Sequence, residues 1–307
     1  LDQATKSSTD PLYVGAATAL ELRATGDAGA SITGLAATTV ASPAVAADSS
    51  LVKVTAQSVA TSGIPAPAII SRAAWGADEN LKASSGADCM TAKVDDTVKA
   101  AVIHHTAGSN DYTAAESASI VRGIYAYHVQ GNGWCDIGYN FLVDKYGTIF
   151  EGRAGGIDKA VIGAQAQGYN SFSTGISCIG SFMTAALPDA AMKSVARLIA
   201  WKLQLHGAPV GGSLVVTSGG GSLNAHPYGE KVTMHRIAGH RDGDSTDCPG
   251  NKLYKQLPAL RTLAESYAGE TPSTPAGKAK LSLVSDRTVA AYGTAATVHG
   301  TLTDAAG

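Results

Sequence analysis

The sequence lacks the features of a membrane protein or a nucleic-acid-binding protein. No run of about 18 apolar residues, the length that predicts a membrane-spanning helix, occurs among the 307 residues. The 23 basic and 25 acidic side chains nearly cancel to a net charge of -2, so no excess charge favours nucleic acid or an anionic membrane. We therefore expect no nucleic-acid and no membrane partner, and ligands that are neutral or of mixed charge.

The sequence does contain enough apolar residues to form a sizeable core, since 45% are hydrophobic and 16% are charged. Alternating helical and strand-like patterns predict an α/β fold with one mixed central β-sheet flanked by helices and a site at one sheet edge. The predicted strands lie at residues 100–103, 140–143, 148–151, 160–164 and 175–182. The predicted helices lie at residues 114–130, 188–206 and 253–267, with Pro258 expected to bend the last helix or delay its start.

Composition also suggests the domain boundaries. Residues 1–62 are rich in Ala, Thr and Ser and predict a small β appendage or an extended wrap. A Gly- and Pro-containing segment then precedes the main domain, residues 63–268. Residues 269–279 read as a linker, and residues 280–307 alternate like the first strands of a truncated immunoglobulin-like module. Residues 210–229 contain three consecutive glycines and predict an irregular, mobile surface loop.

Two segments far apart in the chain carry candidate metal ligands. His240 and Cys248 are separated by seven residues that include Gly243, and imidazole nitrogen and thiolate sulfur are ligands that Zn²⁺ prefers. The apolar strand at residues 100–103 runs into His104 and His105, whose side chains should point to opposite faces. One of these histidines can therefore supply a third ligand, leaving a fourth position for water as in catalytic zinc sites.

Five motifs occur in the order found in the type 2 N-acetylmuramoyl-L-alanine amidases, a group that includes the peptidoglycan recognition proteins. They are His-His-Thr-Ala (104–107), Asp-Ile-Gly-Tyr-Asn-Phe (136–141), Glu-Gly-Arg (151–153), Gly-His-Arg (239–241) and Thr-Asp-Cys-Pro-Gly (246–250). The chain thus resembles a bacterial, secreted member of this family over about residues 69–267. The resemblance implies a Zn²⁺ site formed by His104, His240 and Cys248, peptidoglycan (muramyl peptides) as the partner, and a monomer in the cell wall or secreted.

The resemblance also implies roles for further residues. Tyr139 and Thr246 match positions that complete the catalytic site, although alone they would read as a core tyrosine and a loop-capping threonine. The positions that match substrate-groove residues are His105, His128, Arg153, Gln165 and Asn170. Many relatives have histidine where Gln165 stands, and Arg153 either pairs with a carboxylate of the stem peptide or forms a structural ion pair.

The four cysteines divide into three roles if Cys248 binds metal. Cys89 and Cys135 flank the expected site in loop-like sequence, and we predict a disulfide between them. Cys178 lies in an apolar run and is expected to be a buried free thiol. A disulfide places the protein outside the reducing cytosol.

Two functions follow from this reading. The first is a zinc amidase that cleaves the bond between the lactyl group of N-acetylmuramic acid and L-alanine of the stem peptide. The alternative is a module that recognises peptidoglycan without cutting it. The complete set of three ligands favours the enzyme, because relatives that do not cut typically lack a ligand such as the cysteine.

Overall fold

The computed structural model describes residues 64–269 without a break, together with residues 42, 45, 48, 53–54, 280–285 and 298–303. The chain divides into two compact units, Leu1–Gly269 and Glu270–Gly307. Most of the predicted N-terminal appendage and all of residues 270–279 lie outside the described residues. In the second unit, β10 (Lys280–Ser285) pairs antiparallel with β11 (Val298–Thr303), and the immunoglobulin-like assignment stays a prediction.

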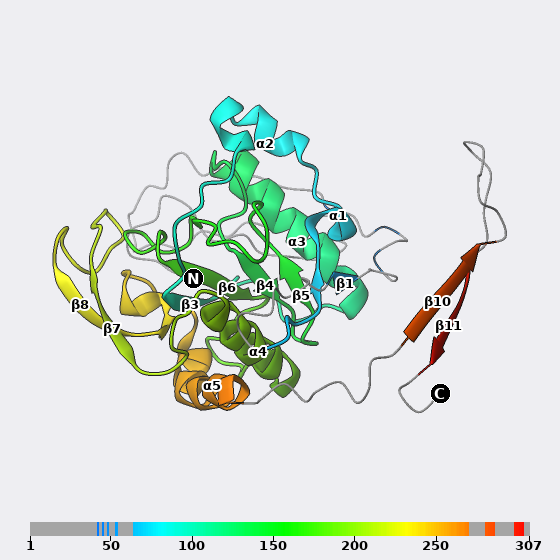
Figure 1. The fold of residues 1–307 in the computed structure, drawn as a ribbon. Helices are drawn as coiled ribbons and strands as arrows, with labels where there is room; N and C mark the ends of the chain where they lie inside the picture. Colours follow the sequence, from blue (N-terminus) through cyan, green and yellow to red (C-terminus); the bar gives the residue numbers. More distant parts are fainter. Residues whose placement is uncertain are drawn as a thin grey trace. The chain divides into compact units, whose positions relative to one another are not determined.

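The first unit is built on a mixed seven-stranded sheet (Figure 1). Its order is β1-β2-β5-β4-β6-β3-β9, with antiparallel pairing at β1–β2 and β4–β5 and parallel pairing elsewhere. The strands are β1 (Lys53–Val54), β2 (Ile69–Ile70), β3 (Ala100–His105), β4 (Phe141–Val143), β5 (Ile149–Glu151), β6 (Ser173–Cys178) and β9 (Ile237–Gly239). The predicted fold class is confirmed.

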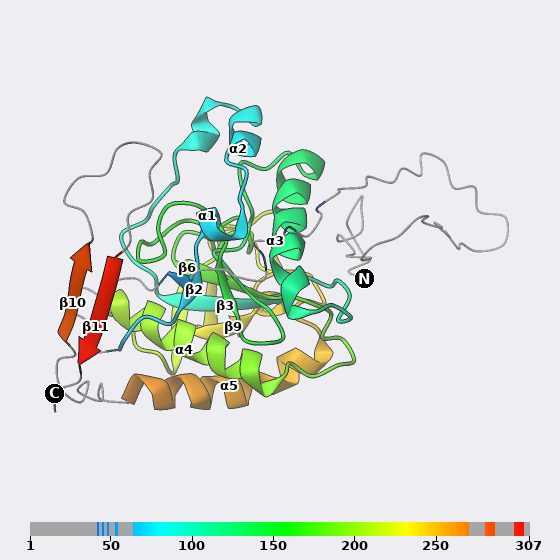
Figure 2. The ribbon, with the colours of Figure 1, turned by 90° about the vertical axis from the view of Figure 1, so that its right-hand side faces the viewer.

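One face of the sheet is covered by α4 (Asp189–Leu205) and α5 (Asn251–Gly269), which pack against each other (Figure 2). Apolar residues recur three and four positions apart along α4, so one stripe of this helix is buried. Leu198 and Ile199 are fully buried there, in one core with Ile103 and Ile176 of the sheet. Both predicted helices are confirmed, and Pro258 lies within α5.

The opposite face carries α1 (Arg72–Trp75), α2 (Asn80–Ser84) and α3 (Ser117–Ala126) (Figure 2). Trp75 is fully buried, and its indole nitrogen donates a 2.7 Å hydrogen bond to the carbonyl of Glu151. The predicted helix at residues 114–130 begins with the 3₁₀ turn η3 (Ala114–Glu116) and ends in one π-helical turn, η4 (Tyr127–Gly131). Another 3₁₀ turn, η2 (Ala87–Met90), follows α2. No helix in the described part of the chain is long and apolar enough to cross a membrane.

The loop prediction for residues 210–229 is wrong, because this segment opens a β-hairpin. Strands β7 (Ser213–Thr217) and β8 (Lys231–His235) pair antiparallel beside the main sheet (Figure 1, yellow). Alternation buries Val232 and Met234 against Tyr169 while their neighbours are exposed, which stabilises the hairpin despite the glycines at its turn. The strand predicted at residues 160–164 is also wrong, since Val161 makes only an isolated bridge with Val94.

The cysteine predictions are confirmed. Cys89 and Cys135 form a disulfide that joins η2 to the loop after η4. Cys178 is a free thiol in the core, and burial raises its pKa to about 12. This thiol is therefore inert at neutral pH.

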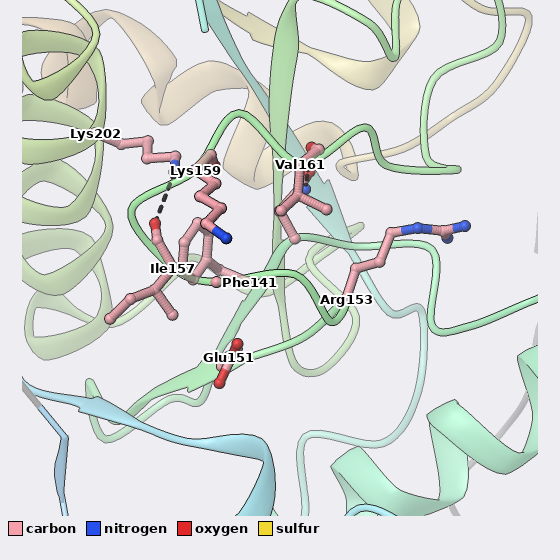
Figure 3. Close-up of a pocket in the computed structure, with 9 residues that line it drawn as sticks. Phe141, Glu151, Arg153, Ile157, Lys159, Val161 and Lys202 are labelled. Carbon is pink, nitrogen blue, oxygen red and sulfur yellow. Dashed lines mark hydrogen bonds between the residues drawn. The ribbon is translucent and has the colours of Figure 1, made fainter. Parts of the chain in front are cut away.

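A lysine is buried between α4 and the loop that follows β5. The amine of Lys202 donates hydrogen bonds of 2.6 and 2.7 Å to the carbonyls of Ile157 and Lys159, beside a cavity of about 10 Å³ (Figure 3). Burial lowers the pKa of Lys202 to about 7, and the carboxylate of Asp158 offsets only part of this effect. A neutral amine has two N–H donors, which matches the two carbonyls.

We predict that Lys202 makes stability depend on pH. The unfolded side chain titrates near pH 10.4 and the folded one near 7, so between these values the unfolded chain binds more protons. The free energy of unfolding should therefore rise with pH by up to about 1.4 kcal/mol per unit from this group alone. Denaturant titrations at several pH values in this window give the free energy of unfolding as a function of pH, and this dependence should have a shallower slope for Lys202→Met. The exposed Lys193→Met on the same helix should keep the wild-type slope, and equal slopes for all three proteins would contradict the assignment.

Candidate metal centre

The sheet brings two of the predicted ligands together. Strands β3 and β9 are parallel neighbours in which Ile103 is paired with Gly239. His104 directly follows Ile103 and His240 directly follows Gly239, so both imidazoles lie side by side at the same end of the sheet. Their ring centroids are 4.4 Å apart.

The loop between β9 and α5 adds the third candidate ligand. It begins with the 3₁₀ turn η5 (His240–Asp242), and the amide of Arg241 donates a 3.0 Å hydrogen bond to the carbonyl of Cys248, which closes the loop. The sulfur of Cys248 also accepts the backbone N–H of His105 at 3.4 Å. One donor atom from each of His104, His240 and Cys248 lies within 4.8 Å of the others, so these residues can hold a metal ion.

Gln165 determines which nitrogen of His104 faces this centre. The amide oxygen of Gln165 bonds Nε2 of His104, and because an amide oxygen can only accept, Nε2 carries the proton. Nδ1 is then unprotonated and lies 3.6 Å from the sulfur of Cys248. Tetrahedral zinc with ordinary bond lengths would separate a nitrogen and a sulfur ligand by about 3.6 Å.

The centre also keeps His104 in the form that binds metal. His104 is 1% exposed, and burial lowers its pKa well below the ordinary value, with a further lowering by the neighbouring His240. A neutral imidazole is the ligand form of histidine. The nitrogen and sulfur donors therefore fit a borderline-soft ion such as zinc.

A row of rings extends from the metal centre through Tyr139 and His128 to Trp134. Tyr139 lies 5.3 Å from the ring of His104 and 5.5 Å from the ring of His128, and Trp134 lies 4.7 Å from His128. The side chain of Trp134 approaches Gly138 so closely that a Cβ there would be 2.8 Å from its ring. Glycine at position 138 therefore leaves room for the ring of Trp134 in this row.

His128 is neutral and has a defined tautomer. It lies on the π-helical turn, and burial lowers its pKa to about 3, helped by the positive charge of Arg153. Its Nδ1 accepts the amide of Gly138 at 3.0 Å, so the proton is on Nε2. No described residue accepts a hydrogen bond from this Nε2–H, which makes it a donor for a ligand.

Two of the predicted substrate contacts have structural hydrogen bonds. His105 points to the face opposite His104, as alternation predicts, and its Nδ1 accepts the amide of Phe182 at 3.2 Å. The side-chain oxygen of Asn170 accepts the amides of Gln165 and Ala166 at 2.8 and 3.0 Å. Their contacts with substrate stay predictions.

Arg153 and Thr246 also form hydrogen bonds with the backbone. The guanidinium of Arg153 donates a 3.1 Å hydrogen bond to the carbonyl of Ile137, and no carboxylate in the described chain forms a salt bridge with it. Burial lowers the pKa of Arg153, although the charge of Asp136 counteracts this. The hydroxyl of Thr246 accepts the amide of Cys248 at 3.1 Å and so braces the ligand loop.

Sequence reasoning missed two residues of the site. Trp134, which is 38% exposed, lies two residues before the Asp-Ile-Gly-Tyr-Asn-Phe motif, and the sequence assigned it no role. Asp244 lies in the ligand loop, and its carboxylate bonds Nε2 of His240 at 2.8 Å. An acidic residue four positions after a histidine is too common a pattern to predict this contact.

Comparison with known proteins identifies the class that this fold and site define. The N-acetylmuramoyl-L-alanine amidase family matches residues 94–251, which include all three candidate ligands. The chain belongs to this family of type 2 amidases and peptidoglycan recognition proteins.

Individual relatives are 30–32% identical to the chain over the aligned residues. Peptidoglycan-recognition protein SC2 of Drosophila melanogaster is 32% identical over 189 residues, 62% of this chain and 84% of the relative. Peptidoglycan recognition protein 1 of Bos taurus is 30% identical over 187 residues, 61% of this chain and 80% of the relative. The expected bacterial origin stays a prediction.

Solved structures include similar chains. Peptidoglycan recognition protein LE in complex with tracheal cytotoxin is 28% identical, with a TM-score of 0.46 over 62% of this chain and 92% of that one. Human PGRP-IβC in complex with glycosamyl muramyl pentapeptide is 26% identical, with a TM-score of 0.45 over 62% and 94%.

We predict that Cys248→Ala abolishes stoichiometric zinc binding, because it removes the sulfur donor from a three-ligand site. Elemental analysis after dialysis against zinc measures this directly. Cys178→Ala removes the other cysteine that lies outside the disulfide, in the core, and should keep one zinc per chain. A Cys248→Ala protein that retained stoichiometric zinc would contradict the ligand assignment.

Proposed function

We propose that the protein is a zinc-dependent amidase that hydrolyses the bond between the lactyl group of N-acetylmuramic acid and L-alanine of the peptidoglycan stem peptide. The observation that carries this proposal is the convergence of His104, His240 and Cys248. Membership of the amidase family supports the reaction type. The names of the relatives support peptidoglycan as the substrate.

The number of ligands favours a catalytic site over a structural one. Structural zinc sites usually have four protein ligands, whereas catalytic sites have three and leave one position open. The donor group in the described chain has three members. A zinc ion held there would lower the pKa of a bound water to about 7 and polarise the carbonyl of the scissile amide.

The residues around the ligands supply what hydrolysis of an amide further requires. Tyr139, next to the ring of His104, is the residue we assign to donate its phenol hydrogen to the oxyanion that develops on the carbonyl. Thr246 is assigned a hydrogen bond near the metal, since its side chain already braces the loop of Cys248.

Three side chains near the candidate metal centre suggest how the substrate binds. His128 presents an Nε2–H donor beside Tyr139, suited to a carbonyl or hydroxyl of the muramyl group. Trp134 offers a partly exposed ring against which a sugar or a lactyl methyl can pack. We assign Arg153 to a stem-peptide carboxylate, because no described carboxylate forms a salt bridge with it.

The proposal extends to the domains, the location and the oligomeric state of the protein. We assign residues 63–268 to the amidase domain, residues 1–62 to an appendage, residues 269–279 to a linker, and residues 280–307 to an immunoglobulin-like β unit. The disulfide Cys89–Cys135 supports action outside the cytosol, in the cell wall or secreted. We expect the protein to act as a monomer.

Cell-wall digestion separates this function from recognition without cleavage. Incubation with purified peptidoglycan should release new free amino groups on L-alanine, and a chelator should abolish the release because it removes the zinc. Derivatisation of amines followed by mass spectrometry identifies the exposed residue. Binding that persists in chelator, with no amine released in its absence, would favour the recognition module instead.

Tyr139→Phe is predicted to keep its zinc and to slow turnover by about 10²-fold or more, the scale of one lost oxyanion donor. Steady-state rates on a soluble muramyl peptide, measured beside the zinc content, test this. Tyr146→Phe changes a tyrosine in the β4–β5 turn, outside the row of rings at the metal centre, and should keep the wild-type rate. Equal rates for wild type and Tyr139→Phe would show that Tyr139 only packs.

A further inference from the structure

The outer side of His240 contacts a buried carboxylate. Nε2 of His240 and an oxygen of Asp244 are 2.8 Å apart, and the side chain of Asp244 is 2% exposed. A carboxylate at this distance accepts a hydrogen bond from Nε2, so the proton of the neutral ring is on Nε2 and Nδ1 carries the lone pair. His104 has the same arrangement, with Gln165 in place of the carboxylate.

The β7–β8 insertion holds Asp244 in place. Its turn segment, residues 223–225, forms an antiparallel bridge with the ligand loop in which Asn224 is paired with Asp244. Ala225 donates a 2.9 Å hydrogen bond to the carbonyl of Gly243, and Ser245 donates a 2.7 Å bond to the carbonyl of Leu223. The backbone on both sides of Asp244 is thereby fixed.

Gln167 links the insertion to the same carboxylate. Its amide donates to the oxygen of Asp244 that bonds His240, at 2.8 Å. Its side-chain oxygen accepts the amide of Leu223 at 2.7 Å, and its carbonyl accepts the side-chain N–H of Asn224 at 2.6 Å. The insertion, the ligand loop and the segment that carries Gln165 therefore form one hydrogen-bonded unit.

The charge of Asp244 also needs a partner. Its second oxygen is buried and has no hydrogen-bond partner in the described chain. In the described chain, His240 is the one basic side chain within salt-bridge distance of it. Burying a carboxylate without compensation is costly. A divalent cation on the far nitrogen of His240 would balance the two negative charges of Asp244 and the thiolate of Cys248.

We propose that Asp244 is a positioning residue for the metal centre: it fixes His240 with its proton on Nε2 and Nδ1 towards the metal, and the insertion segment 223–225 holds Asp244 in that position. The proposal rests on the metal site of the proposed function. It gives the β7–β8 hairpin a role in metal binding, although the hairpin contributes no ligand.

The test measures zinc affinity by competition with a chromophoric chelator. Asp244→Ala should weaken zinc binding by about 10- to 100-fold, the usual effect of removing an outer partner of a metal-bound histidine. Asp244→Asn keeps an oxygen that can accept from His240 and should lose less than about tenfold. Ala225→Pro removes the N–H that bonds Gly243 and should also weaken binding. Tyr228→Ala, at an 85% exposed position of the same insertion, is the control and should bind like wild type.

Two further measurements distinguish a positioning role from a general loss of stability. Thermal unfolding in excess chelator should give similar midpoints for Asp244→Asn and wild type. The visible absorption of the cobalt(II)-substituted proteins should change in Asp244→Ala and stay unchanged in Tyr228→Ala, because only the former alters the geometry of a ligand.

The outcomes are distinct from those of the amidase assay. Wild-type zinc affinity in Asp244→Ala, or an Asp244→Asn protein no better than Asp244→Ala, overturns the positioning role even if the enzyme cleaves peptidoglycan. Wild-type affinity in Ala225→Pro overturns the part assigned to the insertion. Loss of zinc in Asp244→Ala supports the inference even if the wild type proves not to cleave. A wild type that binds no zinc overturns both.

Discussion

The parallel pairing of β3 with β9 is the constraint on which the site depends. Because Ile103 is in register with Gly239, the two following residues, His104 and His240, must emerge together. A shift of one residue would turn one imidazole to the opposite face of the sheet. Two cores fix this register by burying alternate residues of the strands. Ile103 and Ile237 pack on the side of α4 and α5, and Val102 and Ala238 pack on the other side, in the cluster that contains Tyr169 and the β7–β8 hairpin.

Hydrogen bonds from outside the centre then select the nitrogen that each histidine presents. Gln165 and Asp244 both bond Nε2, one as a neutral amide and the other as a carboxylate. The two partners come from different loops, and Gln167 and the β7–β8 insertion connect these loops. The geometry of the centre is thus a property of three segments that are distant in sequence.

Much of this arrangement could be predicted from local patterns. The strand that ends in His104, the helix α4 and the β4–β5 hairpin each have a short-range signal, and the alternation of side chains correctly separated His104 from His105. The hairpin β7–β8 was missed because its glycines outweighed the alternation at Val232 and Met234. The contacts of Gln165 with His104 and of Gln167 with Asp244 join segments more than 60 residues apart, which spacing along the chain does not encode.

The central claim is that two imidazoles and one thiolate of this chain bind a zinc ion with one position left for water. X-ray absorption at the zinc edge of the loaded protein tests it most directly. The account predicts one sulfur at about 2.3 Å and three nitrogen or oxygen neighbours at about 2.0–2.1 Å. A spectrum without a sulfur neighbour, or one with more than one, would contradict it.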